Sequence, residues 1–247
     1  TGAVTLGAIL ALVIFATTRD NKAYMKQHKT SLKPFFKEVI QILSSFKVWM
    51  VGLIGACLYT SLSVFGELWG QTYLEQAHQL TKTQSAHTMS MLFIGWAIGA
   101  PLSGYLSDKF ANRVMPLFIG AIGGLVTIYT VLYVEHLSYG MLNMMILFYG
   151  IFTSTEIIVF VMGKEISKTR ISGTVFAVIN MIVTLLGALL QPTVGWILDI
   201  FGHRILTHGH YVYEISDYQK ALSVLPLSMV LVILLCFIFR EPKKHFQ

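Results

Sequence analysis

The sequence has few charged residues and almost no cysteine. Asp, Glu, Lys and Arg make up 12% of its 247 residues, whereas apolar residues make up 55%. A soluble domain carries roughly twice that share of charge, and a disordered chain is more polar still, so this composition excludes both classes and indicates a membrane protein. The two cysteines, Cys57 and Cys236, lie far apart inside apolar stretches. They predict neither a disulfide framework nor a structural zinc site.

The sequence also lacks the short motifs of common catalytic and cofactor sites. It contains no nucleophile elbow, no glycine-rich phosphate loop and no metalloprotease motif, so we expect no enzyme activity and no cofactor. The imidazoles of His203, His208 and His210 lie close enough in sequence to chelate zinc. No cysteine or nearby second carboxylate completes that set, and we therefore expect no metal.

Long apolar stretches predict six complete membrane-spanning helices. A helix that crosses the hydrocarbon core of a bilayer needs about 20 mostly apolar residues. The apolar residues 1–18 are fewer, and we expect them to be the end of a further transmembrane helix. The six complete spans are predicted at residues 47–70, 86–107, 114–134, 137–163, 173–201 and 221–239.

Basic residues predict how these spans are oriented. Fifteen of the 18 lysines and arginines lie on one side, in 19–47, in two alternate loops and after residue 239, whereas only Lys82, Arg204 and Lys220 lie on the other. The positive-inside rule places the richer side, including the C-terminus, in the cytoplasm. The net charge of +6 is therefore an orientation signal and does not indicate a nucleic-acid site.

The basic segment 19–46 is predicted to be a cytoplasmic loop that contains a short amphipathic helix. Pro34 suits the first turn of a helix, and Phe36, Val39, Ile40 and Leu43 recur at helical spacing. Such a helix lies on the membrane surface, although a plain solvated linker is the alternative. The expected parts are a helix end at 1–18, this loop, a six-helix bundle at 47–239 and a cytoplasmic tail at 240–247.

Small and polar residues mark the helix faces that approach other helices. Gly95, Gly99 and Ser103 form a ridge of small residues in the second span. The fifth span carries a polar stripe, for which contact between helices without any ligand is the alternative to a wet cavity. The stripe consists of Asn180, Thr184, Gly187, Gln191 and Gly195, with Asp199 beyond it.

Glu156 is the most informative ionisable residue, because it lies deep inside a predicted span. Ionisable groups in the membrane are costly and therefore mark functional candidates. Tyr149 and Thr153 share its helix face, and a carboxyl in this place suits proton uptake and release. A structural carboxyl that is hydrogen-bonded to a neighbouring helix is the alternative.

A second polar run occupies the first span. Tyr59, Ser63 and Glu67 recur at i, i+4 and i+8, and Glu67 is expected near the outer end of its helix. Gly66 and Gly70 beside it favour an irregular backbone. Plain exposure of Glu67 at the membrane interface is the alternative. Asp199, at the outer end of the fifth span, is expected only to pair with Arg204.

The loop after the second span carries a recognisable pattern. Gly104, Asp108, Lys109 and Arg113 match the spacing Gly-x-x-x-Asp-Arg/Lys-x-Gly-x-Arg/Lys-Arg/Lys, whereas Ala111 replaces the second glycine. This segment resembles the signature loop of the major facilitator superfamily. The segments Glu67-Leu-Trp-Gly70 and Gln191-Pro-Thr-Val-Gly195 also look like bacterial metabolite permeases of that family.

The resemblance implies an all-α integral membrane protein. The chain would contain the end of helix 6 and helices 7–12, which form one six-helix half of a twelve-helix fold and are built as a 3+3 inverted repeat. The family places helices 7 and 10 along the substrate path, helices 8 and 11 between the two halves, and helices 9 and 12 outside. Its signature loop is a conformational latch, in which Asp108 caps a helix of the other half and Arg113 pairs with a carboxylate.

The function implied is proton-coupled secondary active transport of a small polar metabolite in a bacterial inner membrane. A membrane receptor or scaffold on the same fold is the alternative. The expected partners are the lipid bilayer, a missing N-terminal six-helix half, the substrate and protons, and no nucleic acid. The residues expected to line the substrate cavity are Tyr59, Ser63, Glu67, Tyr149, Thr153, Glu156, Asn180 and Gln191, and Glu156 is expected to exchange the proton.

Overall fold

The computed structural model describes residues 2–17, 32–166, 172–207 and 210–239. The chain divides into two compact units, Thr1–Gln41 and Ile42–Gln247. The first unit contains α1 (Gly2–Thr17), an apolar helix, and most of α3 (Leu32–Leu43). Helix α3 confirms that a helix begins close to Pro34, and Phe36 and Ile40 on its apolar stripe are exposed.

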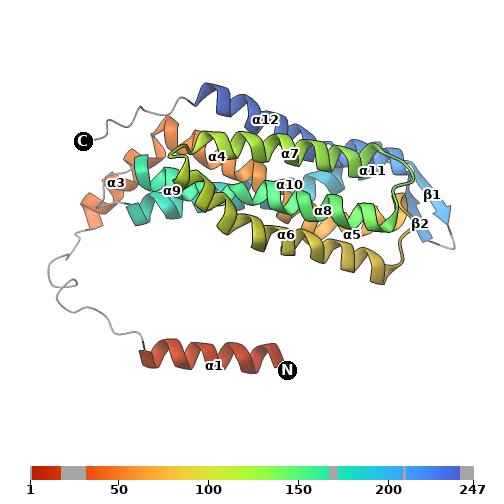
Figure 1. Ribbon diagram of the computed structural model, residues 1–247, viewed down its shortest axis with the longest axis horizontal. Coiled ribbons are helices and arrows are strands. Elements are labelled where there is room, and N and C mark those ends of the chain that lie inside the picture. The colour runs from red at the N-terminus through yellow and green to blue at the C-terminus, as the bar shows by residue number, and fades with distance from the viewer. Residues whose placement is uncertain (1, 18–31, 167–171, 208–209, 240–247) are drawn as a thin grey trace. The chain divides into compact units, whose positions relative to one another are not determined.

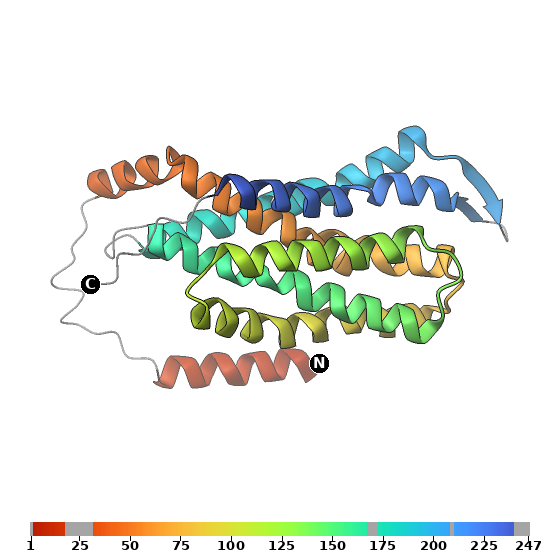
Figure 2. The ribbon, with the colours of Figure 1, turned by 45° about the horizontal axis from the view of Figure 1, so that its top comes forward.

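The second unit contains six helical segments that are long and apolar enough to cross a membrane, as the sequence predicted. Figures 1 and 2 show that these segments run along a common direction as a bundle. Three of them are interrupted by a change of helix geometry. In chain order they are α4 (Phe46–Thr60) with η1 (Ser61–Trp69) and α5 (Gly70–Ala77), α6 (Lys82–Lys109), α7 (Val114–Tyr133), α8 (Tyr139–Thr153) with η2 (Ser154–Glu156) and α9 (Ile157–Ile166), α10 (Ser172–Phe201), and α11 (Ile215–Leu222) with α12 (Val224–Ile238).

Two spans include an amphipathic helical segment beyond the apolar stretch that predicted them. The first continues through α5 to Ala77, and the last begins with α11 at Ile215. Both added segments are amphipathic, and each buries one apolar face, with Tyr73 in α5 and Tyr218 in α11. Hydropathy alone ended these spans early, because it counts the polar face of a helix as strongly as its buried face.

Helices α6 and α8 begin where side chains can satisfy free backbone amides. Thr81 and Gln84 form a reciprocal capping box at the start of α6, in which each side chain accepts from the backbone amide of the other. The hydroxyl of Ser138 accepts from the amide of Met141 at the start of α8. These local signals fix where two of the spans leave their loops.

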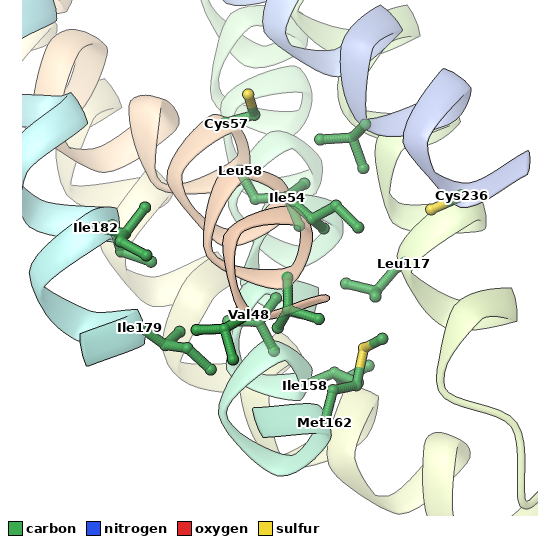
Figure 3. Packing of buried hydrophobic residues seen from close by; sticks show 14 of the residues in the cluster. Val48, Ile54, Cys57, Leu58, Leu117, Ile158, Met162, Ile179, Ile182 and Cys236 are labelled. Carbon is green, nitrogen blue, oxygen red and sulfur yellow. The ribbon is translucent and has the colours of Figure 1, made fainter. Parts of the chain in front are cut away.

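Two clusters of buried apolar side chains form the core of the bundle. In the first, Val48, Ile54 and Leu58 of α4 pack against side chains of α7, α9, α10 and α12 (Figure 3). This cluster includes Cys57 and Cys236, both of which are free thiols. The second cluster lies around η1, α5, α7 and α8. Because lipid is as apolar as these side chains, van der Waals contact rather than water exclusion favours their packing.

The glycine ridge of α6 packs against α8 within the same six-helix unit. A side chain at Gly95 would collide with the carbonyl oxygen of Leu147, and one at Gly99 would collide with the hydroxyl of Ser154. Gly150 of α8 faces α6 in the same close contact. The Gly95 and Gly99 part of the ridge therefore serves contact within this unit, because α8 already covers it.

A β-hairpin follows α10, in a segment where the sequence predicted only a loop. Strand β1 (Arg204–Thr207) pairs antiparallel with β2 (His210–Tyr213), and Arg204 lies opposite Tyr213. Figure 1 shows the hairpin at the end of the bundle where α5 and α11 also lie. Asp199 accepts a hydrogen bond from the hydroxyl of Tyr213 at 2.5 Å. The hairpin therefore supplies Asp199 with a partner that the sequence did not identify.

Candidate functional site

The first span changes its helical geometry in the middle. Residues Ser61–Trp69 form the π-helix η1, which contains Ser63 and Glu67. A π-helix takes an extra residue in each turn, and the amide of Gly70 accordingly donates to the carbonyl oxygen of Phe65. A side chain at Gly70 would lie 2.5 Å from that oxygen, so the turn requires glycine. Segments of this kind frequently lie at functional sites.

Glu67 was predicted to lie near the outer end of its helix. This prediction is wrong, because the span continues through α5 to Ala77. Its Oε2 accepts a hydrogen bond from Nε2 of Gln191 in α10 at 3.2 Å. The same amide nitrogen donates to the carbonyl oxygen of Ser63 at 2.6 Å. Three of the predicted site residues are thus brought together between η1 and α10.

Small residues of α10 allow this close approach. A side chain at Gly187 would lie 2.8 Å from Oγ of Ser63, and Gly195 faces the ring of Trp69. The indole nitrogen of Trp69 donates to the carbonyl oxygen of Gln191 at 3.0 Å. The part of the polar stripe from Gly187 to Gly195 therefore serves as a contact between helices. This was the alternative interpretation of that stripe.

The part of the stripe nearer the start of α10 does not form such a contact, because Asn180 and Thr184 are exposed. The hydroxyl of Thr184 donates to the backbone carbonyl of Asn180 at 2.9 Å. No side chain in the described part of the bundle hydrogen-bonds the amide group of Asn180. This face of α10 presents polar groups that the six helices do not use.

The fourth span is broken at a similar depth. Between α8 and α9, residues Ser154–Glu156 form the short 3₁₀-helix η2. The hydroxyls of Thr153, Ser154 and Thr155 each donate to a carbonyl three or four residues earlier, a pattern that competes with the helical ladder and bends it. Oγ of Ser61 in η1 donates to Oγ1 of Thr153 at 2.9 Å, so the two breaks lie side by side.

Glu156 ends this second break. Its side chain is only 3% exposed, and its carboxylate has neither a hydrogen bond nor an ion pair among the described residues. The phenol of Tyr59 lies within Coulombic range of both Glu156 and Glu67. A buried carboxyl is normally paired or hydrogen-bonded, because an isolated buried charge is costly. Its surroundings therefore differ from those of a carboxyl that joins two helices.

Tyr149 and Thr153 lie inside the bundle and not on a cavity wall. Tyr149 is completely buried, and its ring meets that of Phe65 edge to face with the centroids 6.2 Å apart. Its hydroxyl has no hydrogen-bond partner among the described residues. Thr153 is also buried. The physical reason is that this helix face packs against η1, through Phe65 and Ser61, and against α7 at Gly124.

The loop between α6 and α7 holds the signature residues in one network. Arg113 donates to Oδ1 of Asp108, to Oγ of Ser107 at 3.0 Å and to Oε1 of Glu165 at 2.8 Å. Glu165 lies in the last turn of α9 and is the carboxylate partner that the sequence left unidentified. The hydrogen bonds with Glu165 and, less strongly, with Asp108 raise the pKa of Arg113 despite its partial burial.

The remaining signature residues lie at the surface. The side chain of Asp108 is 73% exposed, although it pairs with Arg113. The ammonium group of Lys109 lies 5.8 Å from the centroid of the Tyr105 ring, which is cation–π distance. A side chain at Gly104 would meet no atom within 4 Å. These residues are therefore accessible to a further contact.

Ala111 stands where the signature has a glycine. The backbone conformation of Ala111 explains why the signature prefers glycine at this position. Its φ angle is 47°, in the left-handed region that favours glycine. The amide of Ala111 donates to the carbonyl of Asp108, and the amide of Asn112 donates to that of Ser107. This pair of bonds is the Schellman motif that ends many helices. The loop thus keeps the glycine geometry with an alanine in place.

Solved structures of similar fold are membrane transporters. The xylose transporter XylE from E. coli in an inward-open conformation matches with a TM-score of 0.62 and 14% identity, over 79% of this chain and 48% of that one. A bacterial homologue of the human lysosomal transporter Spinster, in an inward-facing unoccupied conformation, matches with a TM-score of 0.57 and 20% identity, over 94% of this chain and 55% of that one. The chain thus spans about half the length of each.

Sequence comparison agrees with the fold. A probable transporter of Saccharomyces cerevisiae, MCH2, is 24% identical over 110 residues, which are 44% of this chain and 23% of that protein. The family profile described as Major Facilitator Superfamily matches residues 1–192. The chain, an integral membrane protein with six long apolar helices among its described residues, belongs to the Major Facilitator Superfamily.

Proposed function

We propose that this chain is the C-terminal six-helix half of a secondary active transporter, which carries a small polar metabolite by alternating access and couples it to protons. The single observation that carries the coupling is Glu156, buried without a partner at the break between α8 and α9. In this proposal residues 1–18 end helix 6, residues 19–46 link the halves, and residues 47–239 are helices 7–12.

The substrate path proposed runs along the end of α4, η1 and α10. The polar groups available there include the carboxylate of Glu67, the exposed amide of Asn180 and the phenol of Tyr59. Hydrogen-bonding groups that six helices leave unused need either water or a partner in a membrane. A second half that covers them would enclose a polar cavity, which is suited to a small molecule with hydroxyl or charged groups.

Glu156 is proposed to carry the proton. Because its surroundings provide no cation and no donor among the described residues, it is best accommodated in the protonated form while water is excluded. When the path opens to one side, water reaches the carboxyl and the proton can leave. Tyr59 interacts electrostatically with both acids, so its phenol would sense that change of charge.

The two backbone breaks are proposed as hinges. A π-helix and a 3₁₀-helix have weaker or shifted hydrogen-bond ladders, so helices bend at such points. Their direct contact through Ser61 and Thr153 would make the two spans bend together. The network around Arg113 then acts as a latch, which holds the signature loop to the end of α9 in one state.

Transport by the two-half protein tests the proposal. A thermal-shift panel of sugars, amino acids and organic acids identifies a ligand, and uptake of that ligand is then measured in liposomes with and without an imposed proton gradient. We expect saturable uptake that follows the gradient. Ligand binding with no uptake under either condition would instead favour a receptor or scaffold.

Orientation is tested separately. We propose a plasma membrane, which is the inner membrane in a bacterium, with the C-terminus in the cytoplasm. A single cysteine at Lys82 should then react with an impermeant maleimide added outside, and one at Lys109 should not. The reverse pattern would overturn the topology, because α6 places these two residues at its opposite ends.

A further inference from the structure

The hairpin and the helix after it bring together three side chains that can bind a metal ion. The imidazole of His203 and the carboxylates of Glu214 and Asp217 each present one ligand atom within 4.8 Å of the others. They come from the residue before β1, the residue after β2 and the first turn of α11. Figure 1 shows that these elements meet at one end of the bundle.

The strand register explains why these residues converge. Arg204 pairs with Tyr213, so His203 and Glu214 occupy the next opposing positions at the open end of the hairpin. Asp217 follows Glu214 by three residues, which is about one helical turn and places the two on one side of α11. The geometry therefore arises from the fold and not from a spacing that is visible in the sequence.

The distance between two of the three ligand atoms suits a metal ion, and binding would draw the exposed carboxylate of Glu214 closer to them. Nδ1 of His203 lies 3.5 Å from Oδ2 of Asp217. Two ligands bound at about 2.0–2.1 Å and separated by a tetrahedral angle are about 3.4 Å apart. The Asp217 side chain is only 3% exposed and is held in place, because Oδ2 accepts from the amide of His203 at 2.7 Å and Oδ1 pairs with Lys220 at 3.3 Å. Such secondary bonds orient carboxylate ligands in metal sites.

We propose that His203, Glu214 and Asp217 bind one divalent transition-metal ion of the zinc class. One imidazole and two carboxylates form a mixed nitrogen and oxygen set, which suits zinc or cobalt better than calcium or magnesium, whose ligands are oxygens. The ion would separate two carboxylates that otherwise repel each other, and water would occupy the open position. Binding would fix the base of the hairpin to the start of α11.

Metal titration of the full chain tests this site. With any affinity tag removed, calorimetry with Zn²⁺ should give one ion per chain, and Co²⁺ should add the visible absorption of a tetrahedral site. His203→Gln and Glu214→Gln should each weaken binding about tenfold or more. The matched control is His87→Gln, because His87 is also exposed but bonds to Tyr139 outside the cluster.

Three outcomes would overturn the site. They are no Zn²⁺ binding at all, binding that is unchanged in both His203→Gln and Glu214→Gln, and binding that depends instead on His208 and His210. Asp217→Asn is a poorer test, because Asp217 also holds the amide of His203. Glu214 is exposed and provides a variant that leaves the fold intact. None of these measurements depends on transport, so failure of this site and failure of the proposed function are separate results.

Discussion

The charges of this molecule are organised in two contrasting ways. At the loop between α6 and α7, Arg113 contacts both Asp108 and Glu165, and each of these three groups reaches solvent. In the middle of the bundle, Glu156 is buried and has no such partner among the described residues. The first arrangement stabilises a conformation, whereas the second leaves a group whose state depends on the arrival of water.

Substitutions in these two regions should affect different properties, stability in the Arg113 network and activity at Glu156. Removing a member of a satisfied network leaves the others unpaired and lowers stability. Removing the charge of an unpaired buried carboxyl removes a cost and need not destabilise the fold. Variants of the two regions should therefore have opposite effects on stability and on activity.

Glu156→Gln should have the largest effect on activity. We expect it to abolish uptake that is driven by a proton gradient, because the amide cannot exchange a proton, while substrate exchange and thermal stability are retained. The matched control is Glu75→Gln, which removes a carboxylate that already contacts Gln71 and Ser85. Uptake by Glu156→Gln with an unchanged pH dependence would contradict the proton role.

Arg113→Gln should have the largest effect on stability. It removes the hydrogen bonds to Ser107, Asp108 and Glu165, and we expect a loss of about 1–2 kcal/mol because the network is partly exposed. Unfolding of the purified protein in detergent measures this loss. Arg113→Lys keeps the charge but not the planar fork, and it should restore only part of the stability. Equal stability of all three proteins would contradict a structural latch.

Asp108→Asn should change transport and leave binding alone. The substitution keeps the size of the side chain and removes the charge that a helix N-terminus in the other half would favour, an effect of about 0.3–1 kcal/mol. This corresponds to a change of a few fold in the rate of uptake, with substrate affinity unchanged. Rates and affinities of the two proteins measured side by side test the role. A large loss of affinity with normal turnover would place Asp108 in the substrate site instead.

Ala111→Gly should have the smallest effect, and it should raise the stability of the protein instead of lowering it. Because Ala111 has a φ of 47°, glycine relieves strain there, and we expect a gain of about 0.5–1 kcal/mol. Thermal unfolding measures it. Ala100→Gly in the body of α6 is a suitable control, since glycine inside a regular helix should destabilise by a similar amount. A loss of stability in Ala111→Gly would show that the alanine is not strained.

Side-chain pattern predicted the helices better than it predicted the faces they bury. The signature loop led to Asp108 and Arg113, because its residues are consecutive and their contacts are local. The run Tyr59, Ser63 and Glu67 assumed 3.6 residues per turn, whereas η1 takes an extra residue in each turn and brings Ser63 and Glu67 to Gln191. Gly66 and Gly70 favoured an irregular backbone there, but no local signal in the sequence specified a π-helix.

Tyr149 shows a similar limit of prediction from residue spacing. Its spacing from Glu156 was consistent with a shared polar face, but the close contact of α6 and α8 through Gly95, Gly99 and Gly150 decides which face is enclosed. Glycine spacing indicated that a helix packs there, and it did not indicate which helix. The partner follows from long-range packing, which depends on residues roughly fifty positions away in the chain.

The number of spans, the amphipathic helix near Pro34 and the loop at Asp108 were predictable, because apolar length, helical period and short motifs are local properties of the sequence. Tertiary packing was needed to establish the breaks at η1 and η2, the burial of Tyr149, and the proximity of Glu214 and Asp217 to His203. In a membrane, water exclusion cannot select one helix face over another. Close backbone approach and hydrogen bonds make that selection, and both depend on neighbours that are distant in sequence.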